Sequence, residues 1–175
     1  MHLNYSHHPQ FFTATILQWK HLLKQDEYKD ILIRSLQFLK NEGSILIYAF
    51  VIMPNHIHII WQIQESFKRE NIQMRFLKFT AQQIKFKLLD TNQGYLEEFL
   101  VNAKDRQYQF WQRNPLSIDL WSHDVFIQKL KYIHHNPLQE KWKLVEFPEN
   151  YRYSSAKFYF TGEDEFGLIS HYRGS

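Results

Sequence analysis

Residues 45–63 constrain the fold of this chain more than any other segment. Residues 45–53 (ILIYAFVIM) form a continuous run of β-branched, aromatic and other apolar side chains, a pattern typical of a buried strand. Pro54 and Asn55 then give a turn signal, and residues 56–63 (HIHIIWQI) alternate in character. The segment therefore predicts two strands joined by a short turn.

The second of these strands carries two histidines on one face. A strand has a period of two, so His56 and His58 lie side by side, while the other face presents Ile57, Ile59, Trp61 and Ile63 to a core. Two imidazoles at this spacing can turn a nitrogen toward one cation. They can equally be polar residues on a solvated sheet face, and the strand alone does not decide between the two interpretations.

The flanking segments predict the rest of the architecture. Apolar spacing and turn signals indicate a strand over 11–17, a helix over 27–39 that ends before Gly43, a helix over 66–89, a polar and turn-like stretch over 90–108 and a helix over 124–135. The helix over 66–89 is expected to bury Met74, Leu77, Ala81, Ile84 and Leu88. This order predicts one α+β domain over 1–175, with a ferredoxin-like split βαβ arrangement, a mainly antiparallel sheet, helices packed on it and the histidine strand in a central position.

The last helix adds a second pair of polar side chains. Ser122 is its expected N-cap and Pro137 ends it, and its apolar stripe is Phe126, Leu130 and Ile133. On a helical wheel Tyr132 lies roughly 120° from that stripe, and Asn136 lies within about 40° of Tyr132, one turn later. A phenol and an amide therefore emerge from one helix face. His134 and His135 point elsewhere and are expected to be structural or exposed to solvent.

The chain contains no cysteine, which excludes disulfides, zinc ribbons, iron–sulfur clusters and thiol catalysis. A site made of His56, His58 and the Asn136 amide suits Mg²⁺ or Mn²⁺, which polarise phosphodiesters. Tyr132 can act as a nucleophile, because a nearby cation favours the phenolate; among ten tyrosines, it can also be a packing residue. No GxxxxGK[ST] loop occurs, which fits an ATP-independent reaction.

The net charge is +3, and it is distributed unevenly. Residues 66–87 hold six basic residues and one acid, which gives this segment a charge of +5 and leaves −2 for the rest of the chain. This segment can contact phosphates, or it can be an ordinary solvated helix face. Two arginines close to aromatic residues are weaker candidates for contacts with unpaired bases. The candidate nucleic-acid contacts are Lys68, Arg69, Arg75, Lys78, Lys85, Arg113 and Arg152.

Two motifs together resemble a known family. Residues 51–61 (VIMPNHIHIIW), with a His–apolar–His (HUH) motif, and residues 132–137 (YIHHNP) are similar to the single-tyrosine HUH transposases, and among them to the REP-associated tyrosine transposases of the IS200-like group. Residues 110–113 (FWQR) and 151–156 (YRYSSA) extend the resemblance over about residues 11–160. Residues 114–121 (NPLSIDLW) depart from the pattern expected in REP-associated members, which leaves the DNA target open.

The resemblance implies a DNA transposase that cleaves and rejoins single-stranded DNA beside a hairpin. Tyr132 would be the nucleophile that forms a 5′-phosphotyrosine intermediate, and His56, His58 and Asn136 would hold the Mg²⁺ or Mn²⁺ ion. The family includes monomers and dimers, so a homodimer is possible. A domesticated hairpin DNA- or RNA-binding protein without cleavage activity is the main alternative; a plasmid-relaxation or rolling-circle nuclease and a histidine-metal hydrolase fit less well.

Nothing in the sequence indicates a membrane. Residues 1–10 are polar, and the nine apolar residues over 45–53 are far fewer than the roughly 20 needed to span a bilayer. A cytoplasmic protein with no membrane partner is therefore expected.

Overall fold

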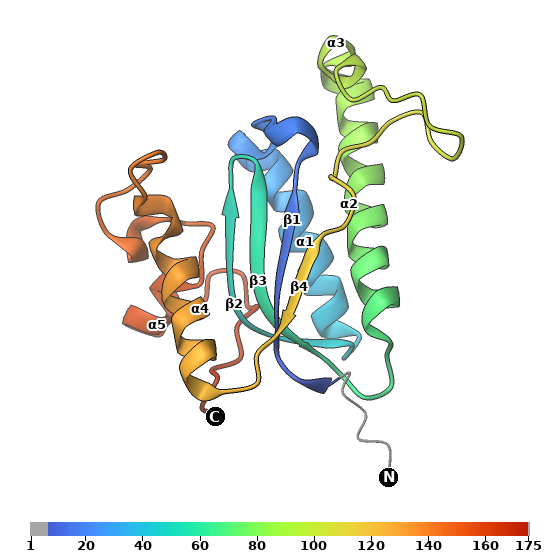
Figure 1. The fold of residues 1–175 in the computed structure, drawn as a ribbon. Helices are drawn as coiled ribbons and strands as arrows, with labels where there is room; N and C mark the ends of the chain where they lie inside the picture. Colours follow the sequence, from blue (N-terminus) through green and yellow to red (C-terminus); the bar gives the residue numbers. More distant parts are fainter. Residues whose placement is uncertain (1–6, 175) are drawn as a thin grey trace.

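The chain folds into a four-stranded antiparallel sheet with helices on both faces (Figure 1). The structure is a computed structural model and describes residues 7–174. The strands are β1 (Gln10–Thr15), β2 (Ile45–Met53), β3 (His56–Ile63) and β4 (Leu116–Asp119). The α-helices are α1 (Asp26–Asn41), α2 (Arg69–Thr91), α3 (Gln93–Glu97), α4 (His123–His135) and α5 (Ala156–Thr161). Short 3-10 turns cover Leu17–Trp19, Leu22–Lys24, Asn136–Leu138 and Pro148–Asn150.

The sheet has the strand order β2-β3-β1-β4, and every neighbouring pair is antiparallel. With α1 between β1 and β2 and α2 between β3 and β4, this is the ferredoxin-like split βαβ arrangement, as expected. β3 is central, because it pairs with β2 on one side and β1 on the other. The histidine motif therefore lies on an interior strand whose backbone is hydrogen-bonded along both edges.

The two faces of β3 enter two separate hydrophobic clusters. Ile57, Ile59, Trp61 and Ile63 pack in the larger cluster, which also contains the buried faces of α1 and α2. Ile60 packs on the opposite face in a smaller cluster with the apolar stripe of α4. This is the alternation that the sequence indicated. It holds the histidines on the α4 side of the sheet, with α1 behind the sheet as Figure 1 is drawn.

The helix ends follow local signals. α1 ends just before Gly43, which adopts a positive φ of 80° and donates from its backbone nitrogen to the Lys40 carbonyl. The Ser122 side chain caps α4 by accepting from the Val125 backbone nitrogen at 3.2 Å. The predicted stripe Phe126, Leu130 and Ile133 is buried.

The stripe predicted for α2 was partly wrong. Met74 is 47% exposed, and the buried face consists of Ile72, Phe76, Thr80, Ile84 and Leu88. Leu77 and Ala81 lie at its margin and are only partly buried. The error has a physical cause: large apolar side chains also occur on the outer face of α2, where Phe79 and Phe86 are exposed, so periodicity alone did not fix which face turns inward.

Two further segments differ from expectation. The stretch predicted as turn-like over 90–108 contains the short helix α3 and an antiparallel bridge between Leu100 and Tyr108. Residues 116–119, where no strand was predicted, form the edge strand β4. Four residues are too few for their alternation to signal a strand. None of the helices among residues 7–174 has both the length and the apolar composition of a membrane-spanning segment.

Candidate metal and tyrosine site

The two histidines of β3 point their rings at one region, with ring centres 4.6 Å apart. His56 Nδ1 lies 2.6 Å from Asn55 Oδ1, which can only accept, so this nitrogen carries the proton and Nε2 keeps its lone pair. His58 Nδ1 lies 2.7 Å from the Thr13 hydroxyl on β1. In both rings Nδ1 is therefore occupied by a protein partner, and Nε2 is the nitrogen available to a metal ion.

Burial keeps both imidazoles neutral. It lowers the pKa of His56 to about 4, an effect that the neighbouring Asn136 amide partly opposes and the Lys141 ammonium reinforces. It also lowers the pKa of His58 well below its ordinary value, with further lowering by the charges of His56, Lys129 and Lys141. Because a metal binds the unprotonated ring, both histidines are in the right state near neutral pH.

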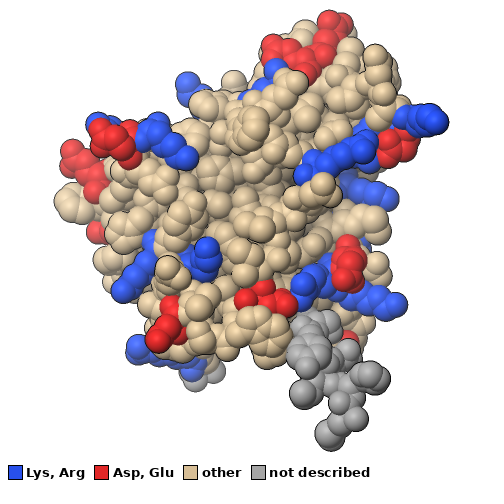
Figure 2. Space-filling model, viewed as in Figure 1, with Lys and Arg blue, Asp and Glu red and all other residues tan. Residues whose placement is uncertain are grey.

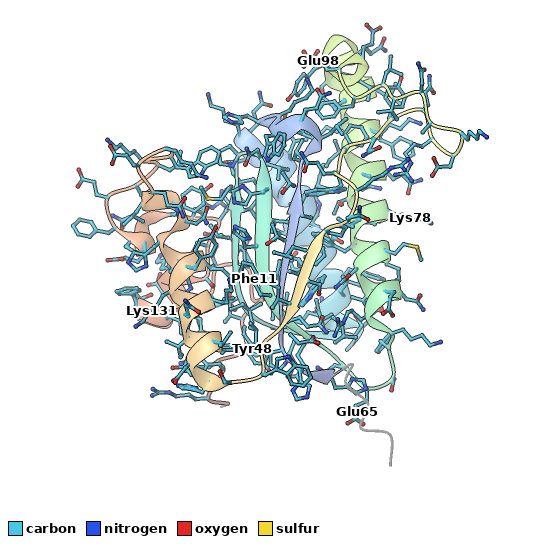
Figure 3. The ribbon with its side chains drawn as sticks, viewed as in Figure 1. Phe11, Tyr48, Glu65, Lys78, Glu98 and Lys131 are labelled. Carbon is cyan, nitrogen blue, oxygen red and sulfur yellow. The ribbon has the colours of Figure 1, made fainter. Side chains whose placement is uncertain are left out.

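Tyr132 reaches the histidines from α4 of the same chain. The centre of its ring lies 5.3 Å from that of His58, and the Phe11 ring packs against both, 5.1 Å from His58 and 6.1 Å from Tyr132. Tyr132 remains 42% exposed, so a large substrate has access to it. Figure 3 shows Phe11 on the sheet face between α4 and β4. The phenol and the imidazoles therefore share one region within a single chain.

Asn136 supplies a third oxygen or nitrogen donor to this region. It follows the last residue of α4, is only 1% exposed, and its Oδ1 is buried without a hydrogen-bond partner among the residues that the structure describes. An unpartnered buried amide oxygen is costly unless a ligand satisfies it. Two imidazoles and this amide could together offer donors to a metal ion. Within residues 7–174 there is no group of three or more His, Asp or Glu side chains that could hold a metal ion.

Lys129 is a site residue that the sequence did not single out. It lies one turn before Tyr132 on α4, and its ammonium is 4.8 Å from the centre of the Phe11 ring and 5.7 Å from that of Tyr132. No carboxylate pairs with it in the described part of the chain. The spacing of three residues was a usable signal, because it places Lys129 and Tyr132 on one helix face.

Thr13 and Asn55 were also missed. Asn55 adjoins His56 in the sequence, so its role in holding the ring had a local signal. Thr13 had none, because its contact with His58 depends on the pairing of β1 with β3, which sets the two residues opposite each other. Such partners orient metal-binding imidazoles and select the nitrogen that faces the ion.

His134 is structural, one of the two roles expected for it. Its ring is buried, and Nε2 lies 2.9 Å from the Ser155 hydroxyl, which also accepts from the backbone nitrogen of Phe50 on β2. His135 is exposed, with Nδ1 at 2.9 Å from the Lys131 carbonyl. Of the two histidines inside the YIHHNP motif, His134 therefore anchors α4 and His135 lies on its surface. Neither belongs to the site of His56 and His58.

We expect His134 to make the fold sensitive to acid. Burial lowers its pKa to about 4, aided by the charge of His135, whereas an unfolded histidine has a pKa near 6.5. The unfolded chain takes up this proton first, so the contribution is complete above about pH 6.5 and is lost as the pH falls toward 4. Between pH 7 and pH 5 the free energy of unfolding should fall by about 2 kcal/mol more in the wild type than in His134→Gln. Urea unfolding at both pH values measures this difference; equal losses in the two proteins would contradict it.

The basic side chains of the segment 66–87 lie apart from the histidine pair, on the side of the sheet that carries α1 and α2. Ion pairs engage three of them: Arg69 with Asp119 at 2.6 Å, Arg75 with Glu42 at 2.6 Å, and Lys87 with Glu27 at 3.0 Å. Lys68 precedes α2, and Lys78 and Lys85 border a hollow beside it. Their role as DNA contacts stays a prediction.

The two arginines with aromatic neighbours lie in different places. Arg113 lines a small hollow next to β4. Arg152 pairs with Glu165 and lies over the Tyr153 ring. The aromatics themselves are largely core residues: the Trp111 indole donates to Thr80, the Tyr153 hydroxyl to Asp30 and the Tyr151 hydroxyl to the Ile52 carbonyl.

Figure 2 shows the sheet face of the molecule as largely uncharged, with Lys and Arg side chains on both flanks.

Comparison with known proteins gives a structural match and no sequence match. No family model matches the chain, and no curated protein does. A solved structure of a REP-associated tyrosine transposase bound to a REP hairpin is similar with a TM-score of 0.65 and 17% identity, over 97% of this chain and 92% of that one. A putative transposase from Deinococcus radiodurans has a TM-score of 0.48 and 13% identity, over 77% and 95%. At the level of the fold the resemblance drawn from the two motifs is confirmed: this chain has the fold of a REP-associated tyrosine transposase.

Proposed function

We propose that this protein is a DNA transposase that cleaves and rejoins single-stranded DNA through Tyr132. The observation that carries the proposal is the convergence, within one chain, of an accessible phenol and two neutral imidazoles whose Nδ1 atoms are held by Thr13 and Asn55. A protein that only bound hairpins would need neither. The fold shared with a REP-associated tyrosine transposase supports the same reading.

The donor set indicates the cofactor. His56, His58 and Asn136 would hold Mg²⁺ or Mn²⁺, since neutral imidazoles and an amide oxygen suit such ions, and the buried Asn136 Oδ1 has no other partner in the described part of the chain. When bound, the ion would polarise the scissile phosphate and stabilise negative charge on its oxygens. Thr13 and Asn55 keep the rings in the required orientation.

The reaction is a transesterification at phosphorus. The Tyr132 hydroxyl oxygen gives up its proton to solvent and forms a bond to the phosphorus of a single-stranded phosphodiester. The bond from phosphorus to the 3′ oxygen of the preceding nucleotide breaks, and that oxygen takes up a proton to leave a free 3′-OH. The products are a 5′-phosphotyrosine and a 3′-OH, and because the ester bond is conserved, another 3′-OH can reverse the step without ATP.

The substrate is proposed to be single-stranded DNA next to a hairpin. The structural neighbour is a transposase bound to a REP hairpin, and its fold extends over nearly the whole of this chain. Tyr132 is exposed beside a sheet face that carries few charged side chains, which leaves room for an unpaired strand (Figure 2). Binding of the hairpin would then determine which phosphate of the single strand reaches Tyr132.

The proposal is tested with hairpin oligonucleotides that carry single-stranded flanks and a label at either the 5′ or the 3′ end. In Mn²⁺ a covalent adduct that survives denaturing electrophoresis should retain the 3′ label only, because Tyr132 keeps the 5′ phosphate of the downstream piece. Hairpin binding without any adduct in Mg²⁺ or Mn²⁺ would reject the transposase proposal and favour a binding protein that does not cleave.

Lys129 is expected to contribute to cleavage. Its unpaired ammonium lies beside the Tyr132 ring, where it can contact the phosphate under attack. Lys129→Gln should lower the single-turnover cleavage rate about tenfold, the effect of losing roughly one charge-assisted hydrogen bond. Lys131→Gln, an exposed lysine on the same helix, is the matched control and should cleave normally. Equal rates for the two variants would show that Lys129 has no role in the reaction.

A further inference from the structure

A large hollow lies on the α1 and α2 side of the sheet, away from the tyrosine. Its volume is about 800 Å³, and its walls come from α1, α2 and residues 106–110. Two apolar rings line it without being buried: Phe38 on α1 is 61% exposed and Phe79 on α2 is 45% exposed. Exposed rings in a concave surface indicate a site that a flat or apolar ligand covers.

Two lysines that border this hollow lack an ion-pair partner. No carboxylate lines it, and Lys78 and Lys85 form no ion pair in the part of the chain that the structure describes. Lys85 holds its ammonium 5.3 Å from the centre of the Tyr108 ring, which also lines the hollow. In Figure 3, Lys78 lies on α2, on the opposite side of the sheet from α4. The hollow thus combines apolar rings with two unpaired positive charges.

A second, smaller hollow of about 220 Å³ continues the first. The two share part of their lining, including Lys78, Arg106 and Tyr108, and the second extends to Arg113 and Pro115. Pro115 directly precedes the edge strand β4, which pairs with β1. β1 in turn contributes Thr13 to His58. The two hollows therefore run along α2 to the residues just before β4, the edge strand next to β1, and β1 carries Thr13 and Phe11 of the tyrosine site.

We propose that these two hollows form a track for a single-stranded stretch of the DNA substrate that flanks the cleaved phosphate. Lys78, Lys85 and Arg113 would contact phosphates, whereas Arg75 and Arg106 are paired with Glu42 and Asp105. Phe38, Phe79 and Tyr108 would stack with unpaired bases. Continuity with the sheet edge favours a nucleic-acid strand over an acidic protein segment, because a strand cut at Tyr132 must leave the site along the surface. This inference rests on the proposed function for its ligand but names residues outside the catalytic region.

The first test measures the salt dependence of binding in a Tyr132→Phe background, which prevents cleavage. The probe is a hairpin DNA with a single-stranded oligothymidine flank, compared with the same hairpin without a flank. Lys78→Ala/Lys85→Ala should weaken binding of the flanked probe about tenfold at low salt and reduce the slope of log K against log salt by about 1.4, at roughly 0.7 per phosphate contact. Binding of the unflanked hairpin should not change.

Two further variants separate the contributions. Phe38→Ala/Phe79→Ala should weaken binding of the flanked probe about tenfold without changing the slope, because stacking releases no counterions. Both rings are exposed, so their removal should leave the fold intact. Lys24→Ala/Lys157→Ala removes the same charge from exposed positions outside both hollows and should leave affinity and slope unchanged.

Photo-cross-linking locates the strand directly. With 5-iodouracil in the flank, cross-linked peptides should contain Phe38, Phe79 or Tyr108. Unchanged affinities in both double variants, with cross-links confined to α4 and β3, would overturn the track. This outcome is distinct from failure of the proposed function: an absent Tyr132 adduct rejects the transposase, whereas flank-dependent binding and the cross-links report on the track alone.

Discussion

Tyr132→Phe should abolish the covalent adduct and lower DNA cleavage by a factor on the order of 10⁴ or more, because the variant keeps the ring but lacks the attacking oxygen. The ring packs at 6.1 Å from Phe11 and 5.3 Å from His58, and both contacts remain in phenylalanine. Hairpin affinity should therefore be preserved. The measurement is single-turnover cleavage of a labelled hairpin oligonucleotide in Mn²⁺, together with a binding titration.

A matched variant controls for loss of a tyrosine hydroxyl as such. Tyr48→Phe removes a hydroxyl that donates to Gln62 at 2.6 Å on the same side of the sheet, and it should cleave normally. Mixing Tyr132→Phe with His58→Ala should not restore cleavage, since the phenol and the imidazoles meet within one chain. Restored cleavage in the mixture would mean that the active site is assembled between two copies.

Removal of the divalent ion should have the second largest effect. Chelation should stop adduct formation, and His58→Ala should lower cleavage at least about 10³-fold in Mn²⁺, because one of two imidazole donors is lost. The same variant should lose the stabilisation by metal, which for the wild type is about 2.7 kcal/mol at a Mn²⁺ concentration of 100 times Kd. Thermal unfolding with and without Mn²⁺ measures this without reference to cleavage.

Variants of Asn136 and His135 test whether the metal ion binds at the predicted ligands. Asn136→Ala should lose the Mn²⁺ stabilisation yet remain folded without metal, because the amide oxygen that it removes has no hydrogen-bond partner among residues 7–174. His135→Ala removes an exposed imidazole from the same helix and should keep both metal stabilisation and cleavage. Full Mn²⁺ stabilisation in His58→Ala and Asn136→Ala would show that the ion binds elsewhere.

Patterns within single elements made most of the fold predictable. The alternation of residues 56–63 correctly placed both histidines on one face of β3, since a period of two is a property of the strand alone. The helical period also predicted that Tyr132 and Asn136 share one face of α4; in the structure Tyr132 lies beside His58 and Asn136 beside His56. The resemblance to tyrosine transposases then joined the two elements, which neither periodicity could do.

Features that depend on contacts between elements were not predictable. Thr13 meets His58 only through the register of β1 and β3, and Phe11 packs beside Tyr132 only because α4 crosses that face of the sheet. The outward face of α2 was misjudged where apolar side chains lie on both of its faces. In each case the deciding information is tertiary packing, which a local pattern does not contain.

The most direct test is to map the covalent adduct by mass spectrometry. Trypsin cleaves after Lys131 and Lys141, and the peptide of residues 132–141 contains Tyr132 as its only tyrosine. After reaction with hairpin DNA in Mn²⁺ and nuclease digestion, this peptide should carry the mass of a 5′-linked nucleotide. A nucleotide attached to any other peptide, or no modified peptide despite strand cleavage, would contradict Tyr132 as the nucleophile.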